Sequence, residues 1–118
     1  MRADPASTEV YLALGVEHLR GARRFAERGR LAFFEEGDPL VFVAVESELR
    51  KAFESLNRLG QPFWRANPLL PRKRIGEIRQ LLTHDYAGID RSEVWEIVTE
   101  EVPTLLRRLA RAKVPKSA

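Results

Sequence analysis

The sequence predicts an all-α protein, an up-and-down bundle of four main helices that forms one domain over residues 1–118. Three observations favour this class. Apolar residues recur every three or four positions along most of the chain, which is the period of a helix face. Residues that start and stop helices stand between these stretches. The β-branched run 40–45 resembles a strand, but no other segment would pair with it.

The first helix is expected over residues 7–27. Beside its apolar positions runs a basic stripe made of Arg20, Arg23, Arg24 and Arg28. A short apolar patch, residues 31–34, follows between two glycines and is either an exposed turn or an extension of the helix. The terminal segments 1–6 and 112–118 lack such a pattern, and we expect them to be flexible.

The second helix is expected to begin at Asp38 and Pro39, because aspartate caps helices and proline suits the first turn. Gly60 is expected to close it. Residues 61–71 contain three prolines and are interpreted as a connection with room for one short helical turn. The third helix then runs over residues 72–83, and its buried stripe is expected to consist of Ile75, Ile78, Leu81 and Leu82. Arg79 lies about 40° to one side of Ile75, which places it at the edge of that stripe.

The fourth helix is expected over residues 91–111. Asp90 and Glu93 have the spacing of a capping box at its start. Pro103 falls inside this helix, where it has no N–H to donate. We therefore expect the helix to bend there.

The composition limits the classes of protein that the chain can belong to. It has no cysteine, so disulfides and thiolate metal sites are excluded. Its polar first residues do not resemble a signal peptide, and no apolar run approaches the roughly 18 residues of a membrane span. These features favour a cytoplasmic protein that does not act in a membrane.

The net charge of +3 is unevenly distributed along the chain. Residues 61–80 hold five basic groups and one acid, whereas residues 81–102 hold six acids and one base. A basic block suits a polyanion such as RNA, and its candidate contacts are Arg72, Lys73 and Arg74. The alternative is an ordinary solvated helix face.

One short motif carries chemistry: Arg79, His84 and Tyr86 lie within eight residues. Arginine can hold a phosphate by two parallel hydrogen bonds, and histidine can transfer a proton near neutral pH. Together these groups could cleave RNA without a metal, with Gln80 and Asp85 as supporting candidates. The alternatives are a capping histidine, an ion-paired arginine and a tyrosine that only packs.

In a straight helix Arg79 and His84 point about 140° apart, so they do not share a face. Two arrangements would bring them together. The helix can end near His84 and let its ring turn back, or a two-fold symmetric homodimer can bring both residues from each chain to one cleft.

Residues 67–109 resemble the HepT family of the HEPN superfamily, the toxin partners of small MNT-type nucleotidyltransferases. The shared features are two prolines, the Arg-x4-His-x-Tyr motif, an Ile-Asp and a Val-Trp pair, and a proline within the last helix: Pro68, Pro71, Arg79, His84, Tyr86, Ile89, Asp90, Val94, Trp95 and Pro103. The preceding helix matches loosely and places Glu54 at an acidic position of the family.

The resemblance implies a HEPN-like homodimer with metal-independent ribonuclease activity and no cofactor. His84 would be the acid and base, Arg79 would bind phosphate, and Tyr86 would receive AMP from a nucleotidyltransferase antitoxin in a type VII-like toxin–antitoxin system. Two alternatives stay open. One is a non-catalytic HEPN subunit that holds substrate for a nucleotidyltransferase, and the other is a basic RNA-binding protein without turnover.

Overall fold

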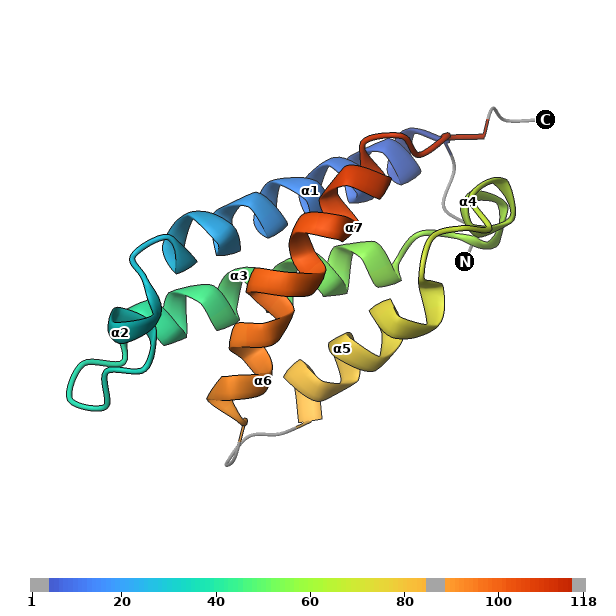
Figure 1. The fold of residues 1–118 in the computed structure, drawn as a ribbon. Helices are drawn as coiled ribbons and strands as arrows, with labels where there is room; N and C mark the ends of the chain where they lie inside the picture. Colours follow the sequence, from blue (N-terminus) through green and yellow to red (C-terminus); the bar gives the residue numbers. More distant parts are fainter. Residues whose placement is uncertain (1–4, 85–88, 116–118) are drawn as a thin grey trace.

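The computed structural model describes residues 5–84 and 89–115. The described chain is helical, with turns and short connections and no strand, which confirms the all-α prediction. Residues 40–45 are helical as expected. Along the chain (Figure 1) the elements are α1 (Pro5–Ala26), α2 (Arg30–Phe33), α3 (Leu40–Asn57), α4 (Gln61–Ala66), α5 (Arg72–His84), α6 (Arg91–Glu96), the π-helical turn η1 (Ile97–Glu101) and α7 (Val102–Leu109).

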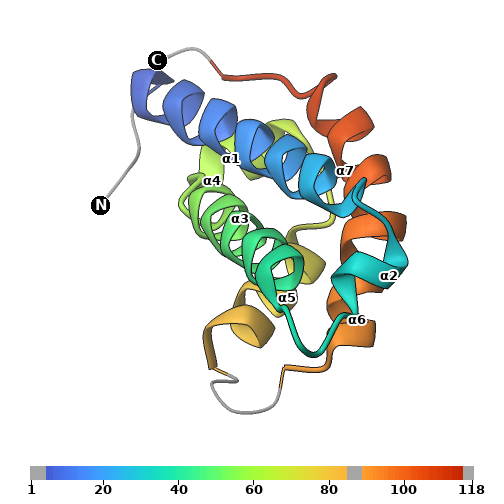
Figure 2. The same ribbon diagram turned by 90° about the vertical axis from the view of Figure 1, so that its left-hand side faces the viewer.

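The bundle is built around the hairpin of α1 and α3. These two long helices lie side by side, and α5 packs on the far side of α3 from α1 (Figure 2). The C-terminal helix, formed by α6, η1 and α7, crosses the hairpin and packs against α1. In the described residues no helix is both long and apolar enough to cross a membrane.

Small residues allow α1 to approach α3 closely. A β-carbon at Gly15 would lie 2.5 Å from Leu56 Cδ2, so a larger side chain does not fit there. Leu19 and Ala22 are fully buried on the same side of α1. Other apolar residues that contribute to the helical periodicity of this segment are exposed on its remaining faces, namely Val10, Leu14 and Phe25.

The apolar patch at residues 31–34 forms the separate short helix α2. Phe33 is fully buried and has edge-to-face contacts with Phe34 and Phe42, with ring centroids 4.9 and 5.4 Å away. Its ring also lies 4.9 Å from that of Trp95. This aromatic cluster joins the start of α3 to the C-terminal helix, which explains why the patch is not a simple turn.

The prediction that Gly60 closes the second helix was wrong. Helix α3 ends at Asn57, with Arg58 at its C-cap. Gly60 has φ −82° and ψ 171°, so it is extended and begins α4 instead of adopting the left-handed conformation of a helix stop. The side chain of Trp64 stabilises this corner, because its buried Nε1 donates a hydrogen bond to Leu59 O at 2.8 Å.

The C-terminal helix starts as the sequence predicts. Asp90 is its N-cap and accepts a hydrogen bond from Ser92 N at 2.9 Å. The π-helical turn stands directly before the segment that contains Pro103, and such turns often accompany an interruption in the hydrogen-bond ladder. The bend at Pro103 stays a prediction, as does flexibility of the terminal segments.

Candidate active site on helix α5

Helix α5 carries most of the residues that the sequence singles out. It begins at Arg72, directly after Pro71, whose carbonyl accepts the first helical hydrogen bond from Ile75 N at 2.9 Å. Ile75, Ile78 and Leu82 are at most 2% exposed and form the face that packs on α3. The burial of this face fixes the rotation of the helix, and therefore which of its polar residues lie at the boundary.

Arg79 lies at the edge of the buried face, as its position in the periodic pattern predicts. Its side chain is half-buried, and Nε lies 3.0 Å from Oε2 of Glu54 on α3. This ion pair leaves the two terminal nitrogens of the guanidinium without a hydrogen bond to another described residue. Among the described residues, the two terminal nitrogens are therefore open to a phosphate while Glu54 holds the guanidinium through Nε.

His84 is the last residue of α5. The side chain of His84 lies outside the described part of the structure, as do Asp85 and Tyr86. Convergence of Arg79 with His84 therefore stays a prediction, and so does the supporting role of Asp85. Gln80, the other supporting candidate, is exposed on α5.

The three basic candidates at the start of α5 have different surroundings. Arg74 has a two-point ion pair with Glu101, in which Nε and Nη2 donate to the two carboxylate oxygens at 2.7 Å each. Glu101, and to a lesser extent Glu77 at 3.6 Å, raises the pKa of Arg74 above its ordinary value. RNA would have to compete with Glu101 for this guanidinium.

Arg72 is held differently. Its Nη1 donates to Gln61 Oε1 at 2.7 Å, and its guanidinium carbon lies 5.6 Å from the centre of the Trp64 ring. Lys73 is exposed between the two arginines. Of the three, Lys73 has no ion pair with any residue of the described segments, so it is the most available to a phosphate.

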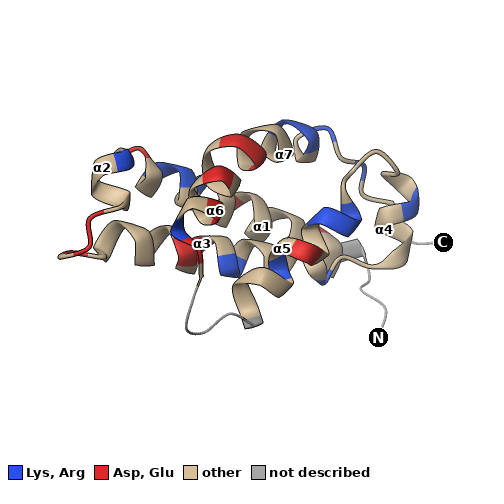
Figure 3. Cartoon of the chain, turned by 60° about the horizontal axis from the view of Figure 1, so that its bottom comes forward, with Lys and Arg blue, Asp and Glu red and all other residues tan. Residues whose placement is uncertain are grey.

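The Arg74–Glu101 pair is a contact beside the candidate site that the sequence did not predict. It ties α5 to η1 across 27 residues of chain, and no spacing rule connects two helices at that separation. In Figure 3 the acidic residues gather along α6 and η1, while α5 carries both signs. A cleft of about 280 Å³ lies between α5 and the C-terminal helix and is lined by Arg74, Arg108, Glu100 and Glu101 among others, but Arg79 does not line it.

Comparison with known proteins identifies the family of the chain. Residues 16–112 match the model of the family described as "Ribonuclease HepT-like". The chain belongs to the HepT-like ribonuclease family. The match extends well beyond the forty residues that carry the motif and includes α3, which supplies Glu54.

A relative in Caldanaerobacter subterraneus subsp. tengcongensis (strain DSM 15242 / JCM 11007 / NBRC 100824 / MB4) bears the name "Putative RNase TTE0752". It is 28% identical over 97 residues, which cover 80% of this chain and 87% of the relative. No solved structure matches the chain at a comparable level of significance.

Proposed function

We propose that this HepT-like protein is a cytoplasmic endoribonuclease toxin that cleaves RNA without a metal ion. The observation that carries the proposal is Arg79, which lies half-buried on α5 with its stem held by Glu54 and its fork free within the described residues. His84 follows five residues later at the end of the same helix. The family match over residues 16–112 supports the assignment of RNA as the substrate.

The proposed reaction uses the substrate's own 2′-hydroxyl as the nucleophile. His84 takes the hydroxyl proton, and the oxygen attacks the adjacent phosphorus. The bond from phosphorus to the 5′-oxygen breaks, and that oxygen takes a proton from protonated His84. The products are a 2′,3′-cyclic phosphate and a 5′-hydroxyl. Arg79 would stabilise the additional negative charge on the phosphate oxygens in the transition state.

Two copies of the chain would form the working enzyme. Each chain offers one motif arginine and one motif histidine, and their directions on α5 differ by about 140°. A two-fold axis near the end of α5 would place both copies of Arg79 and His84 in one cleft. Sedimentation at micromolar concentration tests this step, and a monomer would contradict it.

Control of the activity would run through Tyr86. A partner nucleotidyltransferase of the MNT type, with ATP and magnesium, would join the Tyr86 oxygen to the α-phosphorus of ATP and release pyrophosphate. The attached AMP adds bulk and negative charge near the cleft, which repels the RNA backbone. Mass spectrometry of protein co-expressed with the nucleotidyltransferase should find AMP on the natural protein and none on Tyr86→Phe.

The decisive experiment is incubation of the purified protein with labelled RNA, with and without chelator, beside His84→Ala. We expect cleavage that survives the chelator, products with cyclic phosphate and 5′-hydroxyl ends, and no cleavage by the variant. Replacing a proton-transfer group costs about 10²–10⁴ in rate. Cleavage that the chelator abolishes, or products with a 5′-phosphate, would contradict the mechanism. RNA binding without cleavage and without growth arrest would favour the non-catalytic subunit.

A further inference from the structure

A second basic surface lies on α1, away from the motif. Arg20, Arg23 and Arg24 on α1 and Arg28 in the turn that follows it are all exposed, and we call these four residues the α1 arginine face. Within the described chain none of them has an ion pair with a carboxylate. Helix α3 lies between α1 and α5, so this face is separate from Arg79 (Figure 2).

Many arginines elsewhere have a carboxylate or an aromatic partner, although Arg65, Arg107, Arg108 and Arg111 have neither kind among the described residues. Arg50, Arg74 and Arg79 each have a carboxylate partner. Four further guanidiniums lie over aromatic rings, namely those of Arg30, Arg58, Arg72 and Arg91. The α1 arginine face has neither kind of partner in the described structure, so its charges are available to a ligand.

Two simpler explanations account for only part of the pattern. Cations in the last turn of a helix stabilise it through its dipole, and this explains Arg23 and Arg24 at the end of α1. It does not explain Arg20, one turn earlier, or Arg28, after the helix has ended. The segment is also basic overall, because residues 17–30 hold five arginines against two glutamates.

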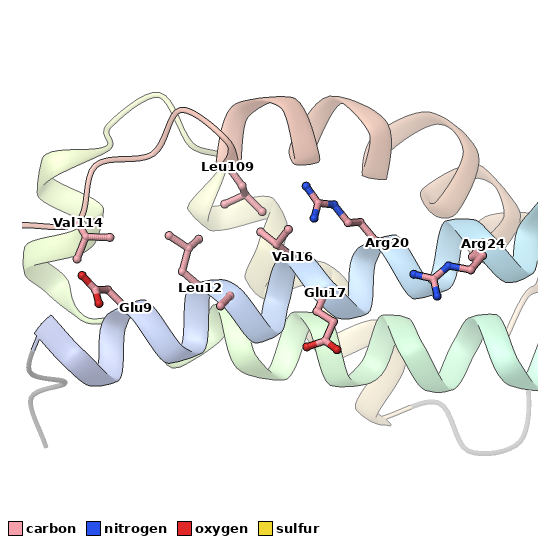
Figure 4. A pocket seen from close by; sticks show the side chains of 9 residues that line it. Glu9, Leu12, Val16, Glu17, Arg20, Arg24, Leu109 and Val114 are labelled. Atoms are coloured by element: carbon pink, nitrogen blue, oxygen red, sulfur yellow. The ribbon is translucent and has the colours of Figure 1, made fainter.

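The arginines stand in a row beside a groove. Arg20 and Arg24 are four residues apart on α1, a rise of about 6 Å. They line one end of a hollow of about 470 Å³ between α1 and α7, whose lining also includes the apolar Leu12, Val16 and Leu109 and the acidic Glu9 and Glu17 (Figure 4). Arg23 and Arg28 do not line the hollow, so the exposed arginines beside it, and not the hollow itself, provide the positive charge that suits a phosphate backbone.

We propose that the α1 arginine face binds the phosphate backbone of RNA as a second site, remote from Arg79. The inference rests on the proposed ribonuclease function and deepens it. A long RNA would contact both surfaces, whereas a dinucleotide would reach only the motif. The face therefore supports binding of long substrates and leaves the chemical step unchanged.

RNA is favoured over an acidic protein as the partner because residues 20–28 expose four arginines and only one large apolar side chain, that of Phe25. A protein interface usually centres on a buried apolar and aromatic patch. The hollow beside Arg20 and Arg24 contains aliphatic side chains but no aromatic one.

The test compares two triple variants that lower the net charge equally. The α1 variant carries Arg20→Gln, Arg24→Gln and Arg28→Gln. The control variant replaces three exposed basic residues outside the face by glutamine, namely Lys51, Arg65 and Arg107. Binding is followed by fluorescence anisotropy with a labelled single-stranded 2′-O-methyl RNA, which the proposed chemistry cannot cleave, between about 50 and 200 mM salt.

We expect the slope of log affinity against log salt to become shallower by about 2 for the α1 variant, since each lost phosphate contact contributes about 0.7. The control should change much less. Cleavage of a dinucleotide should be unchanged in the α1 variant, while kcat/KM for a long RNA falls. If the two variants lose affinity equally, or neither does, the second site is disproved.

An acidic peptide separates the two classes of partner. If polyglutamate displaces the RNA as effectively as unlabelled RNA of equal charge does, the face is a site for acidic protein and the proposal is overturned. The binding measurement does not depend on cleavage, so it tests the second site separately from the proposed function. If the natural protein cleaved no RNA, the proposed function would be disproved.

Discussion

The substitution Arg79→Lys separates the catalytic role of this residue from its structural role. Lysine keeps the positive charge but loses the planar fork and the Nε–H that bonds Glu54. The side chains of Arg79 and Glu54 are 31% and 42% exposed, so water screens their attraction. Such a pair contributes about 0.2–1 kcal/mol to the free energy of unfolding, which corresponds to at most about 4 °C in Tm for a domain of this size.

The effect on RNA cleavage should be far larger. A lost contact to the developing phosphate charge costs about 10²–10⁴ in rate, or roughly 3–5 kcal/mol in activation free energy. Single-turnover cleavage and thermal unfolding by circular dichroism measure the two effects on the same samples. Arg65→Lys, at an exposed position of α4, is the matched control and should change neither.

Two results would contradict this role of Arg79. If Arg79→Lys cleaves RNA within about threefold of the natural rate, its fork does not stabilise the transition state. If Tm falls by more than about 10 °C, the Arg79–Glu54 pair stabilises the fold by more than an exposed ion pair can. The loss of activity would then be explained by unfolding and not by a lost contact to the phosphate.

Four further changes test the fold. Gly15→Ala should lower the free energy of unfolding by about 1–3 kcal/mol in urea denaturation, because the new methyl group would overlap Leu56. Phe33→Ala should cost about 3–5 kcal/mol in the same assay, since it empties the centre of the aromatic cluster. Asp90→Ala removes the N-cap of α6 and should cost about 0.5–2 kcal/mol. Glu101→Gln should lower Tm by only a few degrees, because that carboxylate is 37% exposed, and a larger fall would show that its pair with α5 is structurally essential.

Local patterns in the sequence were sufficient to predict the helices. The spacing of Ile75, Ile78 and Leu82 predicted both the third helix and the face that it buries, and Asp90 marked the start of the fourth. The prediction at Gly60 was wrong because a glycine can either end one helix or precede the next, and its position in the sequence does not distinguish the two.

The sequence alone also placed Arg79 at a helix boundary and, through its motif, pointed to the ribonuclease family. These properties depend on residues close together in the chain, where helical geometry relates spacing to direction. Resemblance marked Glu54 as an acidic position, but only the packing of α3 on α5 brought its carboxylate to 3.0 Å from the Arg79 guanidinium.

Only the tertiary structure decided which charges are paired and which are free. It joined Arg74 to Glu101 and left the α1 arginine face without carboxylate partners among the described residues, although the sequence presents both as similar basic runs. The physical reason is that an ion pair requires its two charged groups to meet within a few ångströms, and the distance between groups on different helices is set by how the core packs.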